Sequence, residues 1–236
     1  YFGRSEYNNE DHFDQTWGIL DEYFNPWTAK QNSELKEPFF GMLFTISSHH
    51  PFYIPDHMKG KLKKGPQPIC ESISYGDYAL EEFFKEAKKQ PWFDNTLFVI
   101  LADHTPGSIT PIYNQRTHLF RIPIVFYHPS GKIKPYKSDE IFQQLDIFPT
   151  ILDLLNIETK YYAYGNSYYD YTDKEALVYI NSTYLYFQNN HMTSFVNDKA
   201  RNLYAFKIHE LDQIDSISYF REEVEIREKR LKAIIQ

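Results

Sequence analysis

The sequence is short of cysteine, of basic charge and of long apolar runs, and each shortage excludes a class of protein. Its single cysteine, Cys70, leaves no disulfide framework and no zinc site built from cysteines. Acidic residues outnumber basic ones, 32 to 25, and a net charge of -7 argues against a nucleic-acid-binding protein, which needs a basic face. No apolar stretch is long enough to span a bilayer and no signal-peptide pattern occurs, so we expect no membrane span in these 236 residues.

What is present is an ordinary globular composition that is rich in aromatic residues. With 42% hydrophobic and 24% charged residues, the chain can form one large domain, or one domain with a small appendage. The 20 Tyr and 19 Phe favour strands and a core, and a sugar-binding or lipid-facing surface is the alternative. The first residue is Tyr rather than Met, which indicates a processed or truncated chain and allows it to be part of a larger protein.

An apolar run at residues 96–102 ends in Asp103 and His104. Its length and its polar flanks predict a strand buried on both faces, as in the middle of a parallel sheet. Ligands of such sheets bind beyond the carboxyl ends of the strands, and a carboxylate beside an imidazole suits a divalent ion such as zinc or manganese. The alternative is that Asp103 caps the following turn and His104 is a polar loop residue.

A second apolar run, residues 39–46, has the same design and leads to His49 and His50. Between the two runs, a helix is predicted from Ser74 or Asp77 to about residue 89, because its apolar positions fall on one face. Strand, helix and strand then predict a parallel crossover unit. One or both histidines can therefore reach the crevice of the first strand.

Further elements complete an α/β layout. They are a third strand at 122–127, a helix from Pro149 to Leu155, and one helical turn at 21–24 before Pro26. From about residue 160 the texture changes, and Tyr- and Phe-rich runs separated by turn residues predict a small antiparallel sheet. A last helix is predicted over 215–235. We therefore expect two parts, residues 1–160 and 161–236. The four short runs lie at 176–180, 183–188, 193–196 and 203–208.

Several ordered motifs of residues 1–157 resemble the lipoteichoic acid synthase family, the sulfatase-like phosphoglycerol transferases of the alkaline phosphatase superfamily. Each motif is modest, and their order and spacing make the set specific. An unrelated α/β domain remains the alternative. The motifs are Tyr1-Phe2-Gly3-Arg4, residues 45–52 with Ser48-His49-His50-Pro51-Phe52, residues 75–84, Phe93-Asp94-Asn95-Thr96, Ala102-Asp103-His104 and residues 144–152.

The resemblance implies a fold, a chemistry and a site. The fold is α/β, an alkaline-phosphatase- or sulfatase-like, largely parallel sheet flanked by helices, followed here by a small C-terminal antiparallel sheet and helix. Asp103 and His104 match the family's metal ligands, and His49 and Arg4 match residues near the substrate phosphate. The metal would be manganese, with zinc, magnesium or calcium as alternatives. The substrate would be a phosphate or sulfate ester of a cell-envelope polymer or lipid headgroup.

The resemblance also implies a location and an incomplete site. The family acts on the extracytoplasmic face of the membrane or in the periplasm, and the full-length protein would carry a membrane span. The family's nucleophilic threonine and metal-binding glutamate lie upstream of the arginine motif, and residues 1–40 have no such pattern. We therefore expect the nucleophile upstream of Tyr1 and the chain alone to be inactive. A non-catalytic relative that binds an anionic glycan or lipid headgroup is the second hypothesis.

Two geometric expectations follow. The side chains of Asp103 and His104 should approach each other closely enough to share one ion. His49 should point into the same crevice, whereas His50, His57 and His118 should not, because neighbouring residues at a strand end diverge.

Overall fold

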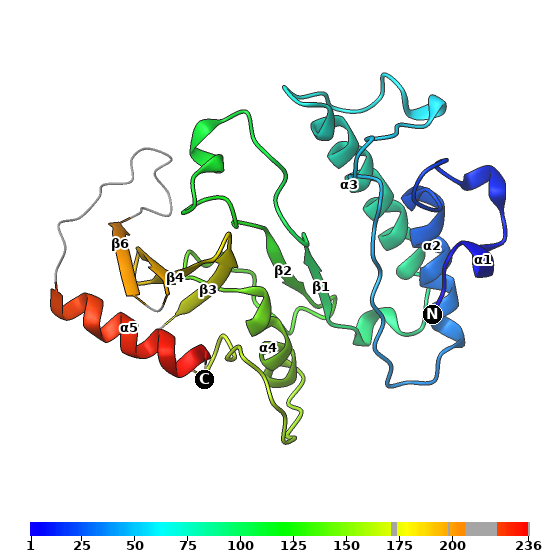
Figure 1. Ribbon diagram of the computed structural model, residues 1–236. Coiled ribbons are helices and arrows are strands. Elements are labelled where there is room, and N and C mark those ends of the chain that lie inside the picture. The colour runs from blue at the N-terminus through cyan, green and yellow to red at the C-terminus, as the bar shows by residue number, and fades with distance from the viewer. Residues whose placement is uncertain (171–173, 198, 206–220, 236) are drawn as a thin grey trace. The chain divides into compact units, whose positions relative to one another are not determined.

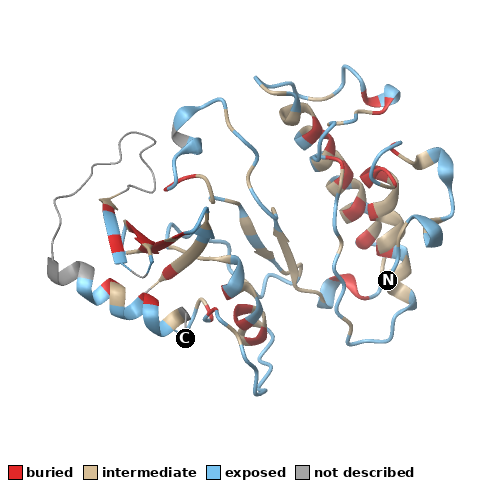
Figure 2. Cartoon of the chain, viewed as in Figure 1, coloured by how far each residue is buried: buried red, intermediate tan, exposed pale blue. Residues whose placement is uncertain are grey.

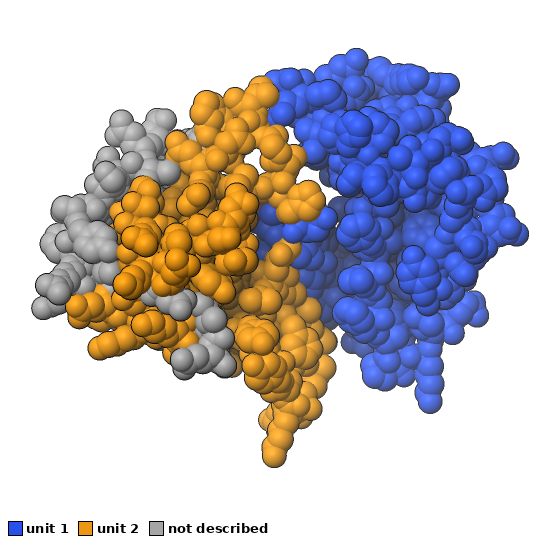
Figure 3. Space-filling model, in the orientation of Figure 1, with its two compact units in different colours: residues 1–103, 122–134 blue, residues 104–121, 135–236 orange. Residues whose placement is uncertain are grey.

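A computed structural model describes residues 1–170, 174–197, 199–205 and 221–235 (Figure 1). The chain forms two compact units (Figure 3). Unit 1 comprises residues 1–103 and 122–134, and unit 2 comprises residues 104–121 and 135–236. Residues 122–134 belong to unit 1, because the strand at residues 124–127 pairs with residues 98–101. The division into residues 1–160 and 161–236 stays a prediction. Within the described residues, no helix combines the length and the apolar character needed to cross a membrane.

Unit 1 is built on two helices that pack together, α2 (Asp21–Gln31) and α3 (Pro68–Ala87), preceded by the short α1 (Arg4–Tyr7). The buried residues of α3 recur every three or four positions, so they form one face that packs on α2 (Figure 2). Bulky aromatic side chains and alanines fill the space between the elements. The core residues are Ala29, Phe83, Ala87, Trp92 and Phe93.

Both helices are longer than predicted. α3 begins at Pro68, because proline at the first helical position needs no backbone N–H there. The single turn expected at 21–24 is part of α2, which continues through Pro26. The buried Ala29, which packs against α3, explains why the helix persists beyond a residue that usually interrupts it.

The predicted strands at 96–102 and 122–127 are confirmed as β1 (Phe98–Leu101) and β2 (Ile124–Tyr127). The predicted burial of the first strand on both faces is wrong for the described chain, because residues 98–100 are only half-buried and Leu101 is 40% exposed. The relation of the two strands is different from the prediction, because β1 pairs antiparallel with β2, Phe98 opposite Tyr127. No parallel pair of strands occurs among the residues that the structure describes. The apolar pattern identified the strands but not their neighbours, which only the three-dimensional pairing decides.

The strand predicted at 39–46 is wrong for the described chain, because these residues form no ladder with another strand. Their burial follows the alternation of a strand only in part. Phe39 and Leu43 pack against the core of unit 1, and the side chains of Phe40 and Met42 are 83% and 82% exposed, but Gly41 and Thr45 are also exposed and Ile46 is half-buried. The segment therefore has neither the ladder nor the complete side-chain pattern of a strand.

Unit 2 contains α4 (Ile147–Leu154) and a four-stranded sheet, and both confirm the prediction closely. The strands follow one another as an antiparallel meander, with the order β3-β4-β5-β6. The end of the last predicted run, 206–208, and the beginning of the last predicted helix, 215–220, lie outside the described residues. The strands are β3 (Glu175–Ile180), β4 (Thr183–Gln188), β5 (His191–Val196) and β6 (Lys199–Ala205).

The last helix, α5 (Arg221–Ile235), packs on the sheet as expected (Figure 1), through a side that includes Leu231 and the buried Arg227. Leu231 is buried and packs with Tyr186 and Phe195 of the sheet. At the edge of this contact, Arg230 binds Glu175 at 2.6 Å, and the phenol of Tyr186 donates to the same carboxylate. An α/β chain with a small antiparallel sheet and a final helix is therefore confirmed.

A buried carboxylate links α2 to α3 and gives a testable measure of unit 1 stability. The hydroxyl of the fully buried Tyr75 donates to Glu22 Oε1 at 2.9 Å, and His57 Nε2 lies 3.0 Å from Glu22 Oε2. Burial and the nearby Glu22 raise the pKa of Tyr75. Tyr75→Phe leaves the carboxylate short of a donor, so we expect a loss of about 1–3 kcal/mol in the free energy of unfolding.

Urea denaturation measures this loss, and Tyr78→Phe is the matched control. Tyr78 lies on the same helix and is half-buried, so the same chemical change there should cost little. A Tyr75→Phe variant as stable as the Tyr78→Phe variant would contradict the assigned role of the phenol.

Candidate functional site

Asp103 and His104 follow the end of β1, and both side chains are exposed. The strand ends at Leu101 and the chain bends at residues 103–104, so polar side chains can stand outside the sheet. His104 Nδ1 lies 3.0 Å from the carbonyl oxygen of Thr105. If Nδ1 carries the proton that this hydrogen bond requires, Nε2 has the lone pair with which an imidazole binds a metal ion.

A carboxylate oxygen and an imidazole nitrogen are two suitable donors for a divalent ion, but two donors do not complete a site. In the part of the chain that the structure describes, no three His, Cys, Asp or Glu residues are grouped so that they could hold a metal ion. The shared ion of Asp103 and His104 therefore stays a prediction. It requires donors beyond those that the described residues bring together.

His49 lies in an exposed turn, and its ring is held by Trp17. The two ring centroids are 4.3 Å apart with the planes at 66°. The indole N–H of Trp17 donates to the carbonyl oxygen of His50 at 2.7 Å, and His49 Nδ1 lies 2.9 Å from the same oxygen. One carbonyl thus fixes both rings, which leaves His49 in a defined orientation at the surface.

The backbone before His49 is anchored by Asp21, the first residue of α2. Its carboxylate accepts the N–H groups of Ile46 at 3.0 Å and Ser47 at 2.8 Å. Burial raises the pKa of Asp21, and the N–H groups of Ile46 and Ser47 act in the opposite direction. The turn that carries His49 therefore depends on a buried carboxylate 25 or more residues upstream.

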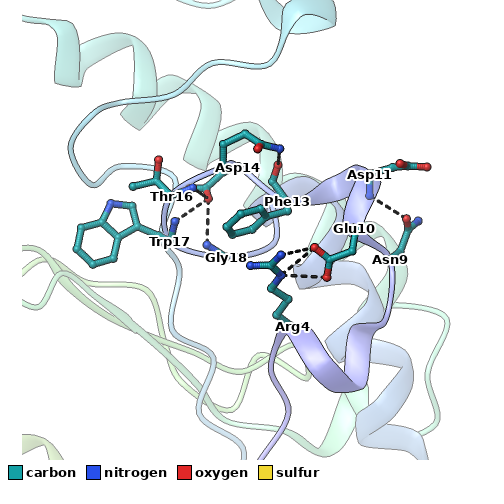
Figure 4. A network of polar contacts seen from close by, with 10 residues as sticks. Arg4, Asn9, Glu10, Asp11, Phe13, Asp14, Thr16, Trp17 and Gly18 are labelled. Carbon is teal, nitrogen blue, oxygen red and sulfur yellow. Dashed lines mark hydrogen bonds and ion pairs between the residues drawn. The ribbon is translucent and has the colours of Figure 1, made fainter.

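Arg4 lies at the start of α1 and is already paired (Figure 4). Its Nε is 3.0 Å from Glu10 Oε1, and its Nη2 bonds Glu10 Oε2. The guanidinium also lies 3.6 Å from the ring centroid of Phe13. The hydrogen bond with Glu10 raises the pKa of Arg4 and lowers that of Glu10. An anionic ligand at Arg4 must therefore compete with Glu10 or share the guanidinium with it.

The loop between Arg4 and α2 contacts both predicted phosphate-binding residues. Asp14 Oδ1 accepts the backbone N–H groups of Thr16, Trp17 and Gly18 at 2.8, 2.7 and 3.0 Å (Figure 4). Phe13 lies under Arg4 on one side of this turn, and Trp17 contacts His49 on the other. The sequence analysis missed Asp14 and Trp17, although an Asp followed by a Gly four residues later is a recognisable turn signal.

The other histidines considered from the sequence have different surroundings. The ring of His50 packs on Phe52 at 5.6 Å, so His49 and His50 diverge as expected. His57 binds the buried Glu22. His118 is buried, its Nδ1 lies 2.8 Å from Thr117 Oγ1, and burial lowers its pKa. The rings of His50 and His57 therefore have contacts of their own, whereas the buried Nε2 of His118 has no hydrogen-bond partner among the described residues.

Comparison with known proteins gives one matching family and several similar proteins. The sulfatase family matches residues 2–157. Lipoteichoic acid synthase 1 of Bacillus subtilis is 25% identical over 93% of this chain and 38% of its own length. A Vibrio parahaemolyticus protein in the alkaline phosphatase superfamily superposes with a TM-score of 0.78 at 22% identity, over 98% of this chain and 58% of its own. For the lipoteichoic acid synthase LtaP from Listeria monocytogenes, the TM-score is 0.75 at 20% identity, over 99% and 61%.

These matches confirm the expected fold. They also show that the chain is shorter than the proteins it matches. The chain spans 38% of the Bacillus relative and about three fifths of the two solved structures.

Proposed function

Because the chain belongs to the sulfatase family, we propose that it carries one part of the active site of a metal-dependent enzyme acting on the cell envelope. The reaction is transfer of phosphoglycerol, or hydrolysis of a phosphate or sulfate ester, on an envelope polymer or lipid headgroup. The observation that supports this proposal is that the family match, residues 2–157, includes all four predicted site residues, Arg4, His49, Asp103 and His104.

In this proposal Asp103 and His104 are two ligands of a divalent ion. Manganese suits a carboxylate oxygen combined with an imidazole nitrogen, and zinc, magnesium and calcium are the alternatives. Such an ion, when bound, activates a nucleophile and stabilises charge on the ester oxygens. The remaining ligands and a nucleophilic threonine or serine belong to polypeptide outside this sequence, upstream of Tyr1.

His49 and Arg4 have the second task, which is to hold the anionic ester. Both are exposed cationic or potentially cationic groups, and both are positioned by the loop that carries Phe13, Asp14 and Trp17. Arg4 would exchange Glu10 for the ester oxygens, a substitution between two anions that a guanidinium binds with the same fork. The pairing with Glu10 keeps the guanidinium oriented until the ester binds.

The proposed cellular location also follows from the resemblance to the lipoteichoic acid synthases. The enzyme acts on the extracytoplasmic face of the membrane or in the periplasm, and a longer protein that contains this chain carries the membrane span. Nucleic acid is not a partner, in keeping with the net charge of -7.

A second candidate is a non-catalytic relative that binds an anionic glycan or lipid headgroup. The observation in its favour is that the described residues bring no three metal-binding side chains together. It predicts that the chain binds a phosphate or sulfate ester without any divalent ion.

Manganese binding tests the first candidate in a longer protein that joins this chain to the remaining ligands. The electron paramagnetic resonance signal of free manganese should fall on titration with the protein, and Asp103→Ala should weaken binding about tenfold or more, since each lost ligand removes a large share of the affinity. Asp94→Ala is the matched control, because Asp94 is another exposed carboxylate close to β1. Equal losses in the two variants would count against a metal site at Asp103.

A further inference from the structure

Three tyrosines of unit 2 form an exposed aromatic surface, which we call the tyrosine platform: Tyr136, Tyr168 and Tyr169. The ring centroids of Tyr136 and Tyr168 are 6.1 Å apart, and those of Tyr168 and Tyr169 are 5.4 Å apart. The side chains of Tyr136 and Tyr169 are 61% and 55% exposed. Aromatic rings that cluster at the surface instead of entering the core mark a place where another molecule binds.

The platform stands on a buried polar anchor. Asp146, which is fully buried, accepts the backbone N–H groups of Gln143 at 3.1 Å and Asn166 at 2.9 Å. The buried Thr150 accepts the N–H of Tyr168 at 2.9 Å and donates to the carbonyl oxygen of Asp146 at 2.6 Å. These hydrogen bonds attach the segment that carries Tyr168 and Tyr169 to the start of α4, so the position of the two tyrosines is set by contacts with the helix.

Close backbone packing strengthens this attachment at Gly165. A Cβ atom at this position would lie 2.1 Å from the carbonyl oxygen of Leu145, so only glycine lets the two segments approach. The tyrosines of residues 168 and 169 thus follow a segment that has little freedom to move away from α4.

The ring of Tyr168, at the centre of the platform, is also held by contacts of its own side chain. The hydroxyl of Tyr168 donates to Ser138 Oγ at 2.9 Å, and the ammonium group of Lys174 lies 4.3 Å from the ring centroid. Phe142 packs against the same ring at 5.9 Å. The outer rings, Tyr136 and Tyr169, are the ones that remain exposed for a ligand.

The tyrosine platform combines apolar ring faces with polar phenol hydroxyls and has no surplus of positive charge around it. Burial raises the pKa values of Tyr136 and Tyr169, whose phenols also interact with each other, and both hydroxyls are protonated at neutral pH as ordinary phenols are. The charged groups that act on these rings are Lys174 at Tyr168, Glu140 at Tyr136 and Asp153 at Tyr169. One cation against two anions gives no basic surplus, which a polyanion or an anionic membrane would need.

We propose that the tyrosine platform binds neutral saccharide units of an envelope glycan or glycolipid. A pyranose ring has an apolar face of C–H bonds that packs on an aromatic ring, and a rim of hydroxyls that pairs with phenols. This surface deepens the proposed function, because it would hold the sugar part of a substrate whose ester reacts elsewhere. It lies on residues that take no part in the predicted metal or phosphate site.

The test is binding of neutral hexasaccharides to the whole 236-residue chain. Maltohexaose, cellohexaose and chitohexaose are titrated without added metal, with saturation-transfer NMR and calorimetry as readouts. We expect at least one to bind, and Tyr136→Ala/Tyr169→Ala to weaken binding about tenfold or more, as expected for the loss of two stacking rings. Tyr136→Phe/Tyr169→Phe keeps the rings and should lose only a part, about threefold.

Tyr179→Ala is the matched control, since Tyr179 lies on β3 of the same unit and is 62% exposed. An unchanged affinity in this variant supports the platform, and an equal loss overturns the assignment. Failure of all three sugars to bind also overturns it. So does platform-dependent binding to vesicles of phosphatidylglycerol and phosphatidylcholine, or platform-dependent dimerisation in sedimentation, when sugar binding is absent.

The experiment also separates this proposal from the catalytic one. Asp103→Ala should leave saccharide binding unchanged even where it removes manganese binding. Loss of the metal site alone therefore counts against the proposed reaction, and loss of sugar binding alone counts against the platform.

Discussion

Incubated with manganese, magnesium or zinc, the purified 236-residue chain is expected to turn over neither a chromogenic phosphodiester nor a sulfate ester above background. In the proposed mechanism a metal-activated hydroxyl forms the covalent bond to the transferred group, and this hydroxyl lies outside the sequence. Removing a nucleophile that acts as a unit with its partners typically costs on the order of a million-fold in rate. Water attacking at an ion held by two protein ligands does not recover that loss.

Of the three hydroxyls close in sequence to His49 and His104, Ser48 is exposed, and those of Ser47 and Thr105 are engaged in structural contacts. Ser47 is buried, and its Oγ lies 3.4 Å from the backbone nitrogen of Asp21, where it caps α2. Thr105 Oγ1 donates its proton to the carbonyl oxygen of Leu119, which leaves it engaged in holding the loop after β1. Both hydroxyls therefore have structural partners.

The control for the activity assay is Asp103→Ala. Turnover by the chain that disappears in this variant would show that the site is complete within these residues, and the proposal of an external nucleophile would have to be abandoned. Turnover that persists in the variant would point to a contaminating phosphatase, which repurification identifies.

The fold shows which features a sequence pattern can and cannot predict. The apolar runs that became β1, β2 and the meander were found because a strand has a local period and local turn residues. The antiparallel pairing of β1 with β2 was not found, because pairing joins residues that are far apart in the chain. Residues 39–46 have the apolar run of a strand, but they form no ladder in the described chain and their side chains alternate in exposure only in part.

In the candidate site, too, local features were predicted from the sequence and contacts between distant residues were not. Arg4, His49, Asp103 and His104 were identified through motifs, which are local stretches of sequence. The groups that hold them were missed where the support is distant, as with Asp21, whose carboxylate anchors residues 46–47. Trp17 was missed because a single tryptophan in a polar loop carries no pattern, although its contact with His49 makes it part of the same surface.

In a longer protein that joins this chain to the nucleophile, His49→Ala should lower kcat about 100- to 1,000-fold, whereas His50→Ala should lower it only a few-fold. The two residues are adjacent, but their rings have different neighbours. Both side chains are exposed. The ring of His49 contacts Trp17 at 4.3 Å and its Nδ1 lies 2.9 Å from the carbonyl oxygen of His50, whereas the ring of His50 packs on Phe52. The two contacts of His49 orient its imidazole so that it can donate to an ester oxygen in the transition state.

The backbone of His50 gives this comparison its internal control. Its carbonyl oxygen accepts from Trp17 and lies near His49 Nδ1, and both contacts survive the change to alanine because they use the main chain. His50→Ala therefore keeps the ring of His49 in place while it removes a neighbouring imidazole. His49→Gln, which retains a donor, should recover part of the lost kcat. Equal losses in His49→Ala and His50→Ala would mean that the turn as a whole, and not the His49 side chain, supports turnover.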